Sequence, residues 1–349
     1  MRKIQWASML LAGAALFTLQ AHADAPPGTT TIGGTMFTDW SYQSQYTNGA
    51  PTNNAGTGVD VKRFYLIVDH QFDDVWSANI TTDFNYVSTD KETQLFDKKA
   101  YVQAKLSNAA IFQMGASDMP WIPFDEGVYG YRFVENTLID RLGFGNSSDW
   151  GIHFLGKDDS NTVNYSVALV NGGGYKNPTR TKTMDWEGRV AFMPVDGLII
   201  AVGGYNGDLG QNTNSTPAIN TATREDALVA YKTSQFTIGG EYFHADNFGA
   251  AYITTPVTNS ADGYSVFGDY VISDNGTAVF ARYDNADPSK DVDPTEKDIY
   301  ANAGISFPTA NKNITWAFVY KYEHEYDDAT IKSFSTTTRQ YGVWAQIKF

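Results

Sequence analysis

Charged residues of both signs cluster in the segment Ser117–Ser148, which lacks the regular alternation of apolar and polar residues found on either side of it. Fixed charges at the narrow point of a water-filled passage set the electrical potential that an ion crosses. The chemistry that these residue types predict is therefore an electrostatic filter with no covalent step. Its candidate residues are Asp125, Glu126, Arg132, Glu135, Asp140 and Arg141. The same charges can instead pair with one another, or with a surrounding wall, and only hold the segment in place.

The segment also contains two proline dipeptides. Proline lacks an amide donor and restricts the residue before it, so turns are predicted at Met119-Pro120 and Ile122-Pro123. One or two helical turns are predicted within Glu135–Leu142. A long charged insertion between strands is typical of a functional loop.

Covalent and metal-based chemistry has little support in the sequence. The chain has no cysteine, which excludes disulfides and thiolate catalysis, and its histidines lack the HExxH spacing of zinc proteases. Gly151–Lys157 matches GxxxxGK, but Asp158 replaces the Ser or Thr of a phosphate-binding loop. The acidic stretch 284–298 lacks the glycine and the spacing of a calcium loop. We therefore expect no enzyme activity, no cofactor and no metal.

Two alternatives of other classes stay open. A hydrolase embedded in a barrel would depend on His244, which has Asp246 close by in the sequence, or on His324. A structural or adhesive barrel would conduct poorly because its interior would be filled.

The sequence around the charged segment alternates with the period of a β-strand. Within 76–86, for example, Trp76, Ile80 and Tyr86 share one face, whereas Asp83 and Asn85 lie on the other. Sixteen such segments are predicted, starting near residues 31, 60, 75, 96, 110, 149, 162, 184, 197, 223, 235, 262, 277, 297, 313 and 339.

The connections between these segments alternate in length. Short ones, such as 73–74 and 107–108, alternate with long ones, such as 88–95, 117–148 and 206–222. Short turns at one rim, long loops at the other and an even strand count are typical of outer-membrane barrels. The predicted fold is therefore all-β: a 16-stranded antiparallel transmembrane β-barrel whose third long loop, Ser117–Ser148, folds inward. The alternating last strand ends on Phe349, which resembles the terminal signature of bacterial outer-membrane proteins.

Residues 1–23 are predicted to be a signal peptide, since Arg2 and Lys3 precede an apolar stretch that ends in Ala21-His22-Ala23. Residues 24–349 would then form a single barrel domain in the bacterial outer membrane. The net charge of −14 argues against nucleic acid as a partner, because such binding requires basic patches. The expected partners are outer-membrane lipid, lipopolysaccharide, and small hydrophilic solutes or ions that diffuse through a channel.

The order of landmarks from Val61 to Leu169 resembles the phosphate-selective porin O/P family. The first landmarks are a basic second strand with Lys62 and Arg63 and a proline-aromatic stretch at 119–124. An acidic-basic pair, Asp140-Arg141, then precedes Gly145, and a strand returns at 150–156. The resemblance implies a homotrimer of sixteen-stranded barrels in which the third long loop narrows each pore. It also implies selection of phosphate or other anions by rows of basic residues.

Those basic rows are only partly present in this sequence. Alternation predicts a pore wall that carries both signs of charge, including Arg63, Lys99, Lys105, Asp83, Arg189 and Glu187. Together with the acidic net charge, this mixed lining predicts a weak selectivity that leans toward cations.

Overall fold

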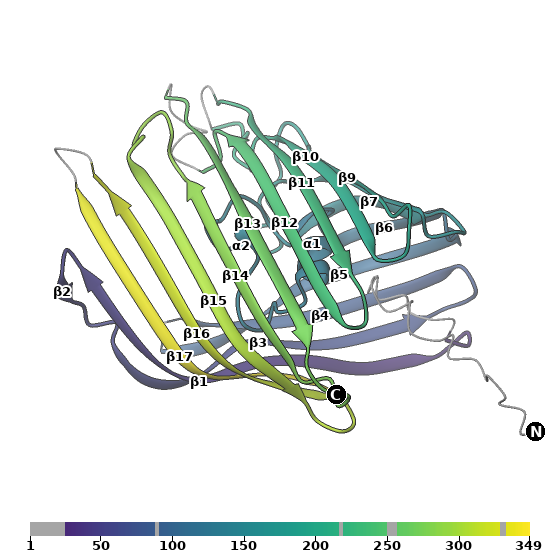
Figure 1. The fold of residues 1–349 in the computed structure, drawn as a ribbon. Coiled ribbons are helices and arrows are strands. Elements are labelled where there is room, and N and C mark those ends of the chain that lie inside the picture. The colour runs from purple at the N-terminus through teal and green to yellow at the C-terminus, as the bar shows by residue number, and fades with distance from the viewer. Residues whose placement is uncertain (1–24, 88–90, 216–218, 250–256, 329–332) are drawn as a thin grey trace, which may run out of the picture.

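The strands of this chain form one antiparallel sheet that closes into a barrel (Figure 1). The computed structural model describes residues 25–349 apart from 88–90, 216–218, 250–256 and 329–332. The sheet closes because β1 pairs with β3 on one side and with β17 on the other, from Thr35 opposite Lys348 to Thr47 opposite Thr336. Strand β2 contributes only two residues. The predicted fold class, a 16-stranded antiparallel barrel, is confirmed.

The elements follow one another as a series of hairpins. In order they are β1 (Thr30–Thr47), β2 (Ala50–Pro51), β3 (Gly56–Gln71), β4 (Trp76–Val87), β5 (Glu92–Ser107), β6 (Ala110–Asp118), α1 (Ile122–Tyr129), α2 (Leu138–Leu142), β7 (Ser148–Lys157), β8 (Val163–Val170), β9 (Asp185–Phe192), β10 (Leu198–Gly207), β11 (Ala222–Lys232), β12 (Phe236–Asp246), β13 (Ser260–Val271), β14 (Ala278–Asp287), β15 (Glu296–Pro308), β16 (Ile314–Asp327) and β17 (Phe334–Lys348). The predicted strand starts lie within five residues of the observed ones.

The outer side of the wall is largely apolar, and charged side chains of the strands point into the barrel. On β12, Ile238 and Tyr242 are 58% and 47% exposed, whereas Glu241 between them is 4% exposed. On β14, Val279 is exposed and Arg282 is buried. A water-soluble sheet would bury its apolar face instead, so this arrangement is the one expected of a barrel whose outer surface contacts lipid.

Residues 119–147, here called the inner loop, fold into the barrel. Figure 1 shows α1 and α2 inside it, and the two helices lie against β11, β12 and β13. Apolar side chains of the loop, including Trp121, Ile122 and Leu138, pack there against small wall residues, among them one alanine from each of five successive strands: Ala191, Ala201, Ala230, Ala245 and Ala261. The hydrophobic core thus lies within the barrel, between the loop and one arc of the wall.

At Ile122-Pro123, where a turn was predicted, the structure begins a helix, α1, that was not predicted from the sequence. Pro123 stands in the first turn of α1, where the amide that proline lacks would have no helical partner. Gly130, with φ of 82°, ends the helix. The second helix, α2, lies inside the stretch that was predicted to be helical. Within the described residues, neither helix is long and apolar enough to cross a membrane.

The fit of Trp121 against the wall gives a first test. A Cβ added at Gly203 would lie 2.6 Å from the Trp121 ring, whereas one added at Gly58 has open space around it. We expect Gly203→Val to displace Trp121 and to lower the free energy of unfolding by roughly 1–3 kcal/mol, as overpacked sites do. Gly58→Val is the matched control.

The measurement is the thermal unfolding midpoint of both variants in detergent, followed by circular dichroism. Equal midpoints for Gly203→Val and Gly58→Val would contradict the packing described here.

Candidate functional site

The wall holds the inner loop by its main chain. Three wall arginines donate hydrogen bonds to loop carbonyl oxygens: Arg189 to Pro120 at 2.8 Å, Arg224 to Phe144 at 2.6 Å and Arg282 to Asn136 at 2.5 Å. An irregular segment inside a barrel has unpaired backbone groups, and each costs free energy unless it finds a partner. The arginines supply those partners at both ends and in the middle of the loop.

Two wall carboxylates do the same for loop amides. Glu187 on β9 accepts from the Trp121 N–H at 2.8 Å, and Glu241 on β12 accepts from the Leu138 N–H at 3.1 Å. Glu187 also pairs with Arg224 at 2.9 Å. The predicted wall residues Arg189 and Glu187 therefore lie on the inner face, as alternation predicted, and both contact the loop.

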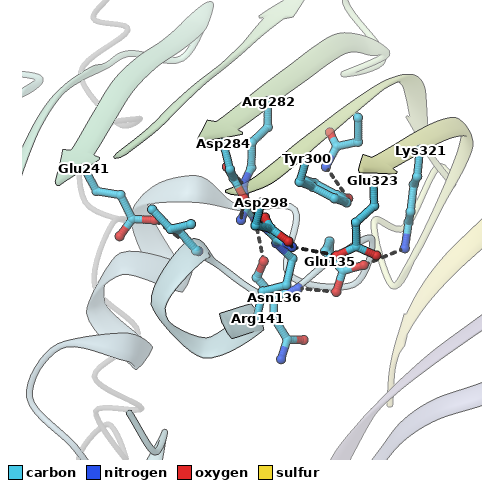
Figure 2. A network of polar contacts seen from close by, with 12 residues as sticks. Glu135, Asn136, Arg141, Glu241, Arg282, Asp284, Asp298, Tyr300, Lys321 and Glu323 are labelled. Carbon is cyan, nitrogen blue, oxygen red and sulfur yellow. Dashed lines mark hydrogen bonds and ion pairs between the residues drawn. The ribbon is translucent and has the colours of Figure 1, made fainter. Parts of the chain in front are cut away.

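Two of the predicted loop charges are ion-paired to the wall (Figure 2). Arg141 on α2 contacts carboxylates of three successive strands: Asp284 at 3.3 Å, Asp298 at 2.5 Å and Glu323 at 2.7 Å. Glu135 pairs with Lys321 on β16 at 3.0 Å. Burial alone would raise the pKa of Glu135, but Lys321 lowers it to about 2, so this carboxylate is ionised throughout the physiological range. Both ion pairs join the loop to the wall, and an additional effect of these two charges on passing ions stays a prediction.

Asp125 lies on α1 among the residues buried inside the barrel. It is fully buried, and neither of its carboxyl oxygens has a hydrogen-bond donor in the described structure. Burial raises its pKa to about 6, in part opposed by contacts with Glu241 and Thr137. Because burial favours the neutral form, the Asp125 carboxyl group carries a proton below a pH of about 6.

The remaining predicted loop charges form a cluster at the free edge of the loop. Arg132 pairs with Glu126 and lies 3.5 Å from Asp140. Their side chains are 15%, 20% and 16% exposed, so water reaches all three. Lys98 on β5 is close enough to interact electrostatically with Glu126. This edge of the loop therefore lies beside the opposite wall. Whether the three residues act on passing ions stays a prediction.

The wall opposite the free edge is formed by β3 to β6. Arg63 lies 3.7 Å from Asp83, and Lys99 pairs with Asp118 at 2.6 Å. Inside the barrel, the side chains of Arg63, Lys99 and Asp118 are 26%, 17% and 42% exposed. Lys105 lies further along β5 and lines a cavity of about 300 Å³ with Ala25 and Asp74. The predicted wall residues thus face inward on both sides of the loop.

Strict alternation missed Lys98 and Lys62. The β4–β5 ladder shifts register between Thr81 and Thr82, and the extra residue, Lys98, turns inward beside Lys99. A second shift, in the β1–β3 ladder, leaves Lys62 beside Arg63, with its ammonium 3.4 Å from Asp39. A β-bulge re-aims side chains in this way. Two adjacent basic residues in a lipid-facing strand are the signal that could have revealed it, because one of them would otherwise face lipid.

The residues of the hydrolase alternative lie at the long-loop end of the barrel. His244 lies 3.7 Å from Asp246. His324 is hydrogen bonded to Thr337 at 3.0 Å and stacks on Tyr326. Among the described residues, no group of His, Asp and Glu side chains is arranged to hold a metal ion.

The architecture is shared with known outer-membrane proteins of low sequence identity. The chain is similar to the outer membrane channel DcaP of Acinetobacter baumannii (TM-score 0.64, 12% identity, 93% of this chain and 98% of that one). It is also similar to an anion-selective porin from Comamonas acidovorans (0.63, 13%, 92% and 100%) and to OmpT of Vibrio cholerae (0.59, 14%, 94% and 99%). No protein-family description and no curated protein sequence matches it. These likenesses show the porin fold.

The proton on Asp125 gives a pH prediction. The folded protein keeps this proton up to a pH of about 6, whereas the unfolded chain loses it near its ordinary pKa of 3.8. The folded state therefore binds more protons between these values, and this contribution to the free energy of unfolding falls as pH rises, by roughly 1–3 kcal/mol in total. Asp125→Asn needs no proton there, so its unfolding midpoint should vary less than that of the wild type between pH 4.5 and 7.

Asp158→Asn is the matched control, because Asp158 lies in a short exposed turn and its pKa is lowered by hydrogen bonds from Ser160 and the Val163 amide. It should retain the wild-type pH dependence over the same range. Parallel pH profiles for Asp125→Asn and the wild type would contradict protonation of the buried Asp125 carboxyl group.

Proposed function

We propose that this protein is a porin, a channel of the bacterial outer membrane through which small hydrophilic solutes and ions diffuse passively. The observation that carries the proposal is the position of the inner loop. Its core packs on β9 to β13, and Phe133 and Val134 near its tip contact residues of β1, β14, β16 and β17. Charged side chains on β3, β5 and β6 remain accessible to water inside the barrel. A passage on that side, between the wall and the loop edge, is what a channel requires.

The proposed passage carries both signs of charge. Arg63, Lys99 and Arg132 face Asp83, Asp118 and Glu126, mostly as close pairs. Paired charges largely cancel at a distance, so we propose weak selectivity that leans toward cations. The resemblance to the porin O/P family implies a phosphate-selective role. That role would require rows of basic residues without acidic partners, and the proposed lining contains such rows only in part.

The setting of the channel follows from the same fold. We propose that the signal peptide, which lies outside the described residues, directs export, and that the apolar outer face contacts membrane lipid while the long loops contact lipopolysaccharide. A solved form of OmpT from Vibrio cholerae with the same fold is a trimer, which supports the proposal of a homotrimer here. The alternative of a filled structural barrel fits less well, because Asp118 is 42% exposed inside the barrel.

Conductance across a planar bilayer tests the channel. We expect the purified protein to open in discrete steps and to give a small reversal potential of cationic sign in a KCl gradient. Added phosphate should leave the current unchanged. Protein that is folded by circular dichroism but never conducts would exclude the channel.

The loop edge can be tested with one substitution. Arg132→Gln removes a positive charge beside the proposed path, where a unit charge at about 4 Å in water acts with about 1 kcal/mol. The permeability ratio should therefore move toward cations by up to severalfold, and less at high salt. Arg180→Gln, in the exposed loop between β8 and β9, is the matched control. Equal reversal potentials for the two variants would remove Arg132 from the filter.

A further inference from the structure

Lys98 is a buried ammonium group, and within the described part of the chain no carboxylate forms an ion pair with it. Its residue is 8% exposed, and its Nζ donates to the Ser147 hydroxyl at 2.7 Å. The same nitrogen lies over two aromatic rings, at 5.5 Å from the centre of Tyr65 and 4.9 Å from that of Tyr175. The nearby acid Glu126 is already bound to Arg132. Burying a charge is costly unless a partner of opposite sign offsets it.

A second ammonium group shares the Tyr175 ring. Lys176 Nζ lies 5.9 Å from that ring centre and 4.3 Å from the centre of Phe96, and it donates to Asn85 at 3.2 Å. Phe96 and Tyr175 are stacked with centroids 5.7 Å apart. The main chain fixes this arrangement, because Trp150 Nε1 donates to the Tyr175 carbonyl at 2.8 Å and the Tyr175 N–H donates to Ser148.

A third cation, Arg63, completes the cluster. Its Nε has no hydrogen-bond partner in the described structure, and its ion pair with Asp83 is long, at 3.7 Å. Partial burial, together with the positive charges of Arg63 and Lys98, lowers the pKa of Lys176 despite the opposing effect of Asp83. Arg63 and Lys98 therefore both lie close enough to act on Lys176, and the carboxylate that opposes them there is that of Asp83.

We propose that Arg63, Lys98 and Lys176, with Tyr65, Phe96 and Tyr175, bind a small aromatic carboxylate. Its carboxylate would take the place opposite the two ammonium groups, and its ring would lie against Phe96 and Tyr175. The three aromatic side chains favour a planar apolar body over an inorganic anion, which would gain nothing from them. The site deepens the proposed function by naming a solute class, and it rests on that function only for the route by which the ligand enters.

Direct binding to detergent-solubilised protein tests the site without requiring conductance. The probes are sodium benzoate, acetate and phosphate at equal ionic strength, titrated by calorimetry. We expect benzoate to bind at least tenfold more tightly than either other anion, because burying a ring is worth at least about that factor. Benzoate no tighter than phosphate would overturn the aromatic assignment, and no saturable binding at all would overturn the site.

Variants separate the charge from the rings. Lys176→Gln should weaken benzoate binding about tenfold, as loss of a charge-assisted hydrogen bond does. Phe96→Ala should reduce the preference for benzoate over acetate while leaving acetate binding unchanged. Lys290→Gln, which removes an exposed loop lysine paired with Asp262, is the control and should bind as the wild type does. Equal losses in Lys176→Gln and Lys290→Gln would show only a general effect of net charge.

If the protein conducts in a bilayer but does not bind benzoate, the proposed benzoate site is overturned and the channel function stands. If the protein binds benzoate but never conducts, the channel function is overturned and the site stands.

Discussion

The structure depends on one constraint: a chain that enters the barrel must find partners for its own backbone polar groups. Strands satisfy theirs in the ladder, but residues 119–147 cannot. The wall meets this need with charged side chains, since Arg189, Arg224 and Arg282 cap carbonyl oxygens while Glu187 and Glu241 accept from amides. Hydrogen bonds to ionised groups are stronger than neutral ones. The buried charges of β9 to β14 are therefore explained first as supports for the loop.

Those supports also divide the interior into two regions. On the side of β14 to β16, Arg141 and Lys321 neutralise acids and fix the loop. On the side of β3 to β6, the side chains of Arg63, Lys99 and Asp118 remain accessible to water. Small residues make the division possible, because the alanines of β9 to β13 leave room for Trp121 and Leu138 to pack on the wall. Packing and electrostatics thus place the loop to one side of the barrel.

The sequence predicted the barrel well because alternation and loop length are local signals repeated in every hairpin. It also predicted which segment enters the barrel. It could not assign the six loop charges to their partners, since Arg141 meets Asp284, Asp298 and Glu323 across more than 140 positions of chain. Nor could alternation place Lys98, because one bulge reverses the face of a residue. Burial raises the pKa of Asp125 and contacts with Glu241 and Thr137 oppose that rise, and only the folded chain brings these residues together.

Anchoring through the main chain has an evolutionary consequence. Carbonyl and amide groups are the same whatever side chain a position carries, so substitutions at Glu126, Arg132 or Asp140 leave the contacts of Pro120, Asn136 and Phe144 in place. The shape of the loop and the charges on its free edge can therefore diverge at different rates. Substitutions on the free edge therefore change its charge while the anchoring of the loop to the wall is retained.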